Sequence, residues 1–287
     1  MSGLLATARA LSRDAAHTFS QRGARLMSGS VAFYALVSVV PILVIALELA
    51  ALVVDEQQAS STVSAELEAW VGPTGAATVL SLVRAVRGRP HSGMTSVLGA
   101  LVLVYASTRL FSQLTTALDI LWETPPEPDP RDWAERVRRQ VKRRGLAFAM
   151  VLLVGVSLTA TVLLHAALAA GRRASGFEVP VSRLVEAPAS LLLTSLLFAA
   201  MFRLLPRGRV NLRDALVGGA VTSVLFTAGA RVVTAFVARR DTTVYGAAAS
   251  LVVLLLWMHY SAQAFFFGAA FTRAHARRGE LLARDQK

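Results

Sequence analysis

Long apolar blocks separated by charged segments dominate the pattern of this 287-residue chain. The clearest block runs from Val244 to Phe271 and holds 28 residues without one Asp, Glu, Lys or Arg. A helix of about 20 apolar residues is long enough to cross a bilayer core about 30 Å thick. Charged residues border the block on both sides, at Asp241 and Arg273. The block therefore predicts a membrane-spanning helix rather than a buried helix of a soluble domain.

Five further apolar blocks raise the number of predicted spans to six, so the predicted fold class is an all-α polytopic membrane protein. The spans are predicted at residues 31–54, 95–121, 146–170, 184–204, 212–238 and 244–271. Together they form one membrane domain, residues 31–271. A cytoplasmic amphipathic segment, residues 1–30, precedes this domain, and a basic tail, residues 272–287, follows it.

Short amphipathic helices are predicted outside the spans, on the membrane surface. In residues 1–30 apolar side chains recur at helical spacing between arginines, at Leu4, Leu5, Ala8, Leu11 and Ala15. This pattern is typical of an interfacial helix. We do not expect a signal peptide here, because the apolar block that follows is long enough to span the bilayer. Residues 55–93 predict two more amphipathic helices, separated at Gly72-Pro73.

Composition agrees with this class and excludes several others. The chain is 54% hydrophobic, has a mean hydropathy of +0.53 and contains no cysteine. Disulfides, thiolate nucleophiles and cysteine-ligated metals are therefore excluded. The phosphate-binding, zinc-protease and serine-hydrolase motifs are also missing, and no histidine pair has metal-ligand spacing. We accordingly predict no enzyme, no catalytic residue, no metal and no cofactor.

The net charge of +12 is distributed unevenly across the predicted topology. Six spans place both termini on one side, and 20 of the 30 Lys and Arg residues fall on that side against 8 on the other. An excess of Lys and Arg marks the cytoplasmic side of a membrane protein. We therefore expect both termini in the cytoplasm, and basic residues that contact membrane lipids rather than nucleic acid.

Arg109 is the strongest candidate for a functional residue, because it lies about 14 residues into the second span. A charged side chain at that depth is costly unless it finds a partner. Its guanidinium could contact an anionic substrate, or it could tie helices together through Glu48, Glu186 or free backbone carbonyls. Asp119 lies ten residues further along the same helix and nearly opposite Arg109, so it is not a predicted partner of Arg109.

Other polar residues inside the spans are candidates for a polar core or for helix packing: Tyr34, Ser38, Tyr245, Trp257, His259, Tyr260 and Gln263. A lone histidine such as His259 is typically a hydrogen-bonded packing residue, with a proton relay as the alternative.

Two features predict how the spans bend and approach one another. Pro41 should kink the first span, and Ser38 could hydrogen-bond a carbonyl that the proline frees. Small residues allow close approach of neighbouring helices, at Gly218, Gly219, Gly246 and Gly268.

Four stretches resemble signatures of the YihY/BrkB family of bacterial inner-membrane proteins: SVAFYALVSVVPIL at 30–43, YASTRLFSQLTTALDILW at 105–122, residues 202–221 and residues 244–271. The second stretch includes Arg109, and the fourth includes Tyr245, Gly246, Trp257 and Tyr260. The family often has Asn where Asp119 stands. The additional charge here favours an ion pair between Asp119 and a basic residue.

This resemblance implies a six-span protein of the bacterial cytoplasmic membrane, of poorly defined activity. A ribonuclease label once given to members is regarded as mistaken, and the chain has no carboxylate cluster to hold a nuclease's metals. Three functions stay open. The first is transport or flipping of an anionic amphiphilic solute, with Arg109 at its headgroup. The second is a non-catalytic scaffold that recruits partners through basic cytoplasmic loops. The third is an intramembrane lipid-modifying enzyme that uses His259 and Asp119.

Overall fold

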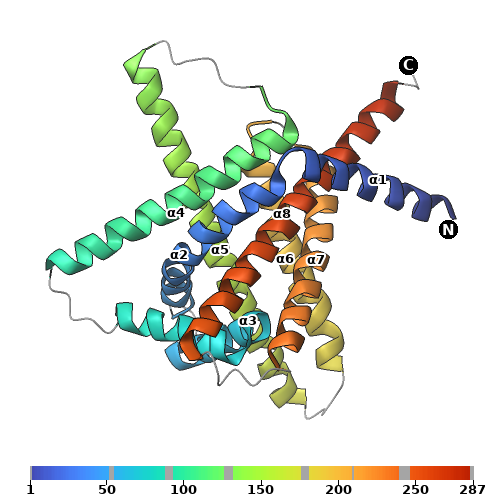
Figure 1. Ribbon diagram of the computed structural model, residues 1–287. Helices are drawn as coiled ribbons and strands as arrows, with labels where there is room; N and C mark the ends of the chain where they lie inside the picture. Colours follow the sequence, from blue (N-terminus) through green and yellow to red (C-terminus); the bar gives the residue numbers. More distant parts are fainter. Residues whose placement is uncertain are drawn as a thin grey trace.

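The computed structural model describes residues 2–51, 55–87, 93–125, 132–175, 181–208, 210–238 and 246–284. Within these residues every regular element is an α-helix, which confirms the all-α prediction (Figure 1). The helices are α1 (Ser2–Gln21), α2 (Ala24–Ala51), α3 (Glu56–Arg87), α4 (Gly93–Trp122), α5 (Trp133–Ser175), α6 (Val181–Leu204), α7 (Leu212–Ala238) and α8 (Gly246–Arg284).

Three of the described helices contain a segment long and apolar enough to cross a membrane: Ala187–Leu204 in α6, Leu212–Val232 in α7 and Val252–Gly279 in α8. The segments Arg9–Gln21 and Ala24–Val40 form a fourth candidate as a pair bent by 74°. The chain is thus a helical membrane protein, and its last three predicted spans coincide with candidate spans. The total of six spans remains a prediction.

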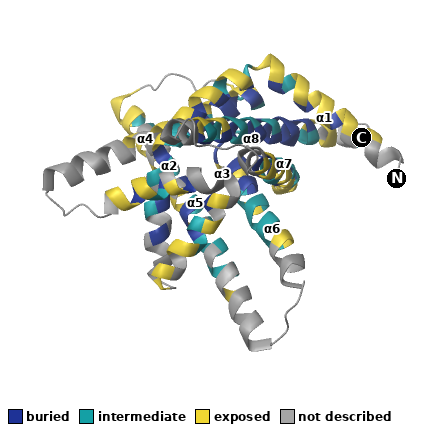
Figure 2. Ribbon diagram, turned by 60° about the horizontal axis from the view of Figure 1, so that its bottom comes forward, coloured by how far each residue is buried: buried dark blue, intermediate teal, exposed yellow. Residues whose placement is uncertain are grey.

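The main hydrophobic core gathers buried side chains of α2, α4, α6 and α8. Phe198 and Phe202 are four residues apart on α6, so they share one helix face. That face packs on α8, where the Phe265 ring centroid is 4.9 Å from that of Phe202. Leu118 and Leu121 of α4 are fully buried in the same cluster. Buried residues follow much of α8 in Figure 2, which makes α8 the central helix of the bundle.

α7 and α8 approach closely through two matched pairs of small residues. A Cβ built on Gly218 would lie 1.6 Å from Oγ1 of Thr272, and one built on Gly268 would lie 1.7 Å from Oγ1 of Thr222. Each threonine hydroxyl also donates to the glycine carbonyl one turn earlier on its own helix, at 2.8 Å for Thr222 and 2.7 Å for Thr272. The predicted packing role of Gly218 and Gly268 is confirmed.

Gly219 serves a second close approach, between α7 and α6. A Cβ there would lie 2.4 Å from the Ser195 carbonyl oxygen and 2.8 Å from the Ala199 nitrogen. The predicted role of Gly219 is therefore also confirmed. The side-chain position of Gly246 lies outside the described residues.

Two predictions about amphipathic segments are corrected. Residues 56–87 form one continuous helix, α3, although we expected a break at Gly72-Pro73. Its buried Val79 and Val83 pack with Leu43 and Leu47 of α2, so tertiary packing outweighs the local helix-breaking signal. The α1 helix is present as predicted, but α8 covers the described part of its apolar face, at Leu11 and Ala15. This part of the face is therefore not free to lie on lipid.

The expected link between Pro41 and Ser38 is also corrected. The Ser38 hydroxyl donates to the carbonyl of Tyr34 at 2.5 Å, with Ala35 at 3.4 Å. The carbonyl that a proline at position 41 leaves without its donor is that of Val37. Ser38 therefore does not compensate Pro41. The helix α2 continues past Pro41 to Ala51, and the side chain of Pro41 lies outside the described residues.

Candidate functional site

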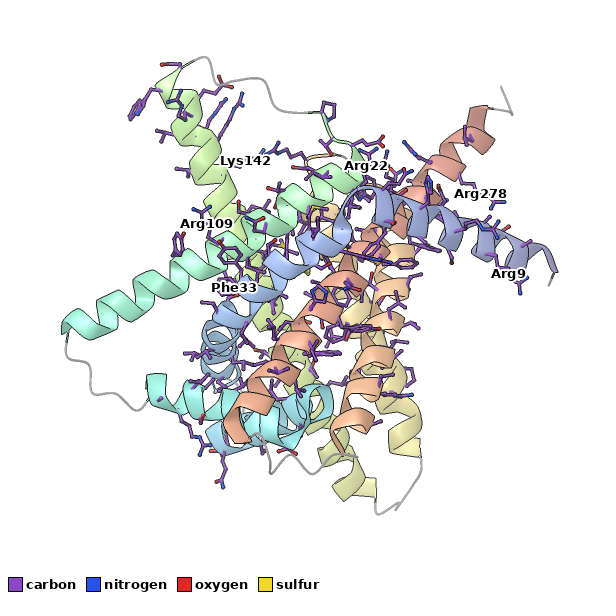
Figure 3. All side chains as sticks on the ribbon, viewed as in Figure 1. Arg9, Arg22, Phe33, Arg109, Lys142 and Arg278 are labelled. Atoms are coloured by element: carbon purple, nitrogen blue, oxygen red, sulfur yellow. The ribbon has the colours of Figure 1, made fainter. Side chains whose placement is uncertain are left out.

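Arg109 lies on an exposed aromatic face of α4. Its Nε donates to the hydroxyl of Tyr105, one turn earlier, at 3.2 Å, and its guanidinium carbon lies 5.3 Å from the centre of the Tyr105 ring. Tyr105 is 58% exposed, and Phe33 on the neighbouring helix α2 is 57% exposed. Figure 3 shows Arg109 and Phe33 on these two adjacent helices. We call this set, with the half-buried Tyr34, the Arg109 face.

The Arg109 face has aromatic and cationic groups but no described counter-charge. The rings of Phe33 and Tyr34 meet edge to face at 5.5 Å, and Tyr34 lies close enough to Arg109 for an electrostatic interaction. Among the side chains that the structure describes, no carboxylate forms an ion pair with Arg109. The guanidinium is exposed rather than buried between helices. The side chains of Glu48 and Glu186, the carboxylates named for an interhelical tie, lie outside the described residues, so both interpretations of Arg109 stay predictions.

Asp119 has a different and local role at the end of α4. It is buried, its Oδ2 lies 3.2 Å from Nε of Arg207, and its Oδ1 accepts the Arg207 backbone N–H at 3.0 Å. The predicted ion pair with a basic residue is thereby confirmed. As expected, Arg109 is not that residue. Asp119 fixes the loop between α6 and α7 against α4.

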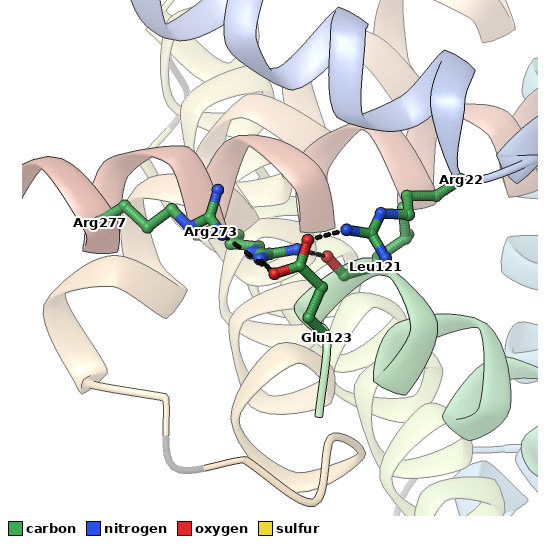
Figure 4. Close-up of polar contacts among 5 residues, drawn as sticks. All are labelled: Arg22, Leu121, Glu123, Arg273 and Arg277. Carbon is green, nitrogen blue, oxygen red and sulfur yellow. Dashed lines mark hydrogen bonds and ion pairs between the residues drawn. The ribbon is translucent and has the colours of Figure 1, made fainter. Parts of the chain in front are cut away.

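A second ionic assembly lies beside this loop, around Glu123 (Figure 4). The Glu123 carboxylate forms ion pairs with Arg22, Arg273 and Arg277, the last at 3.0 Å. Arg273 is 7% exposed and also donates to the Leu121 carbonyl. We call these residues the Glu123 cluster.

The backbone at the end of α4 places Glu123 at the centre of this cluster. Glu123 has φ +51°, the left-handed conformation that commonly ends a helix, and its N–H donates to the Ile120 carbonyl at 3.2 Å. The α1–α2 junction turns similarly at Gly23, with φ +68°, directly after Arg22. Two helix ends thus present opposite charges to each other, and α8 adds the remaining cations.

The Glu123 cluster joins segments that are far apart in sequence and carries more positive than negative charge. Three guanidiniums share one carboxylate, so the cluster keeps a formal excess of two positive charges. Nearby in sequence, His275 Nδ1 lies 2.8 Å from Asp214 Oδ1 and connects α8 to the start of α7. The α1–α2 junction, the end of α4 and the tail of α8 therefore meet at one end of the bundle. The predicted six-span topology would place these three segments on one side of the membrane.

The polar residues of the last span divide between packing contacts and a local pair. Trp257 is 2% exposed and stacks on Tyr260, with centroids 6.0 Å apart. The Tyr260 hydroxyl donates to the Leu225 carbonyl at 2.7 Å, and its ring fills the space above Gly229. His259 and Gln263 interact with each other at 2.7 Å.

These contacts favour packing over a shared polar site in the last span. His259 has its partner on its own helix, whereas Asp119 is engaged with Arg207, so the two acid–base groups of the enzyme hypothesis have separate partners. Tyr245 lies outside the described residues. Among the described residues, no group of three or more His, Cys, Asp or Glu side chains could hold a metal ion.

Sequence reasoning missed the Glu123 cluster, because its arginines were counted only as loop charges that set orientation. One signal was available in the sequence. Glu123 is a single acid directly after a predicted span, on the side where basic residues predominate.

The helices, their apolar segments and the ionic end of the bundle define the class of a polytopic helical membrane protein. Residues 15–287 match the family described as Virulence factor BrkB, and the chain belongs to this family. The resemblance seen in the four sequence stretches is therefore confirmed.

Three relatives are each named UPF0761 membrane protein. The Janthinobacterium protein is 26% identical over 278 residues, which cover 93% of this chain and 59% of the relative. The Cronobacter sakazakii protein is 29% identical over 185 residues, 63% of this chain and 59% of the relative. The Ralstonia nicotianae protein is 28% identical over 263 residues, 88% of this chain and 56% of the relative. This chain thus spans well under two thirds of each relative's length. No solved structure matches it.

Proposed function

We propose that this protein transports or flips an anionic amphiphilic solute across the membrane, with Arg109 contacting the anionic headgroup. The observation that carries the proposal is the exposure of Arg109 within a predicted span, beside exposed aromatic rings and without a described carboxylate partner.

In the predicted span, Arg109 lies too deep for an ordinary surface role. Ten helical residues separate it from Asp119, which corresponds to about 15 Å along α4. A charged group at membrane depth is costly and typically marks a pathway for substrate or ions. An anionic headgroup would supply the missing counter-charge.

The chemistry of the Arg109 face suits a molecule with both a charged head and an apolar tail. In the described contacts only Nε of Arg109 is engaged, by Tyr105, so both terminal nitrogens remain available. Two parallel N–H donors match the oxygens of a phosphate or carboxylate. The exposed rings of Phe33 and Tyr105 offer apolar contact to the tail. The proposal requires a hydrated path to this exposed face, through which the headgroup reaches Arg109 while the tail contacts the exposed rings.

Flux through proteoliposomes tests this function. Wild-type protein should accelerate the movement of a fluorescent phosphatidylglycerol between leaflets, measured by quenching with a membrane-impermeant reductant. Arg109→Gln should lower the rate tenfold or more, because a charged hydrogen-bond donor to the headgroup is lost. Arg109→Lys should retain part of the rate, since it keeps the charge but loses the fork of donors.

The matched control is Arg231→Gln, which removes another exposed arginine, on α7, and should leave the rate unchanged. Folded wild-type protein that moves neither anionic nor zwitterionic lipid would contradict the proposal.

A second candidate function is a non-catalytic scaffold, and one observation favours it. The start of α5 presents exposed basic residues, Arg136, Arg138 and Lys142, outside the predicted spans. Stable capture of a protein partner through these residues, together with an absence of flux, would support the scaffold instead.

A further inference from the structure

The first 13 residues of α5 project from the rest of the molecule. Figure 1 shows this segment, residues 133–145, standing apart from the bundle before α5 joins α2 and α6. At 1.5 Å per residue it extends about 20 Å. We call it the α5 arm.

Apolar residues form a stripe along one side of the α5 arm, and no described side chain packs over this stripe. Trp133 is 74% exposed, Val137 41% and Val141 63%. These residues are spaced by four, so they fall within about 80° of one another around the helix. An exposed stripe led by Trp is unusual on a surface that faces only water.

Basic residues occupy the remaining sides of the α5 arm. The segment contains six Lys and Arg residues and one acid, Glu135. Glu135 is paired with Arg139 at 2.5 Å, so its charge is already compensated. Arg136 and Arg138 flank the apolar stripe, and Lys142 lies on the far side; all three are exposed.

We infer that the α5 arm lies on an anionic lipid surface, with Trp133, Val137 and Val141 among the headgroups and acyl-chain ends. A helix with a Trp-containing apolar face and a basic polar face binds at a membrane interface. Tryptophan prefers this interface, and each Lys or Arg near an anionic leaflet strengthens the attraction. The charge and the apolar pattern of the arm thus both favour an anionic lipid surface as its partner. The bilayer is adjacent, because α5 enters its predicted span at residue 146.

Gly145 gives the arm freedom to turn toward the leaflet. A Cβ built on it would meet nothing within 4 Å, so the helix side that carries Gly145 is open at the base of the arm. A glycine inside a helix also lowers the cost of a bend, because it stabilises a helix less than any other residue except proline.

The absence of native cysteine allows a direct test on the full chain in proteoliposomes. A polarity-sensitive fluorophore is attached at Val137→Cys, on the apolar stripe, and in a matched variant at Glu135→Cys, 200° away around the helix. In vesicles that contain phosphatidylglycerol, the probe at 137 should shift to the blue and become shielded from a water-soluble quencher. The probe at 135 should stay in water, and in pure phosphatidylcholine the shielding at 137 should largely disappear.

A charge-deletion variant separates lipid attraction from other causes. Arg136→Gln, Arg138→Gln and Lys142→Gln, combined with the probe at 137, should weaken docking about fivefold per charge and on the order of 100-fold together. These side chains are exposed, so the bundle should fold unchanged. A probe at 137 that stays in water on anionic vesicles would overturn the inference. Equal shielding in both lipids and in detergent would also overturn it, because that result indicates a protein partner or a second copy.

Discussion

At the scale of single residues, one carboxylate organises the ionic end of the bundle. Glu123 ends α4 and receives Arg22 from the α1–α2 junction and Arg273 and Arg277 from α8. Without the carboxylate these cations would face one another, and Arg273 is buried. Glu123 therefore stabilises the junction of three segments by more than one contact.

Glu123→Gln should lower the free energy of unfolding by about 1–2 kcal/mol, because an amide replaces a charged acceptor at a partly exposed site. Unfolding by a denaturing detergent, followed by circular dichroism, measures this change. Glu68→Gln on α3 is the matched control. Glu68 is exposed and contacts Ser64 at 3.3 Å, so its loss should cost less than about 0.5 kcal/mol. Equal effects of the two substitutions would show that the Glu123 cluster contributes little.

The same scale shows what sequence could and could not predict about charged residues. The pairing of Asp119 with a basic residue was predictable, because a charge near a span end needs a partner. For Glu123 the sequence offered the lone acid but not its partners, since Glu123 and Arg277 lie 154 residues apart and meet only after the helices pack. The exposure of Arg109 could not be predicted from the sequence either, because periodicity identifies a helix but not which side of it the neighbouring helices cover.

At the scale of elements, the contact between α7 and α8 depends on glycines, which have no side chain to keep the two helices apart. Gly218 faces Thr272 and Gly268 faces Thr222, so each helix offers a small residue where the other offers a threonine. In a membrane, helix association relies on such close packing, because lipid tails are as apolar as the side chains they replace.

Gly218→Ala should destabilise the protein by about 1–3 kcal/mol, because the added methyl group overlaps Thr272 and lies 3.2 Å from the Gly268 carbonyl oxygen. Gly279→Ala on α8 is the control: nothing lies within 4 Å of its added Cβ, so stability should stay equal or rise by up to about 1 kcal/mol. Thermal unfolding in mild detergent compares the two. Similar stability of both variants would contradict the close packing of α7 on α8.

Sequence predicted α7 with its observed bounds, 212–238, and named the glycines on which it packs. It did not predict that α3 is continuous or that α8 covers α1. Both outcomes depend on apolar surface supplied by other helices, such as Ala270 and Phe271 beneath Leu11 and Ala15. Local signals such as Gly72-Pro73 carry no information about that surface.

At the scale of the whole molecule, membership of the BrkB family and the candidate spans establish a membrane protein, and the orientation follows as a prediction from charge. The excess of Lys and Arg on one side predicts that this side is cytoplasmic. Reporter fusions after residues 125, 208 and 284 should therefore be active in the cytoplasm, and fusions after residues 88, 176 and 240 should be active outside. Any fusion on the wrong side would contradict the six-span topology.

The central claim is that Arg109 is reachable by polar solutes from within the membrane domain. Single cysteines at 105, 109, 112, 113 and 116 lie along one face of α4, and Leu114→Cys on the buried face is the control. Labelling by a membrane-impermeant maleimide, in intact cells and in inverted vesicles, measures access from each side. The account predicts labelling at 109 and its neighbours on the exposed face, with position 114 protected. Protection of all these positions from both sides, in variants that still fold, would show that Arg109 is closed off from water and would contradict the proposed transport.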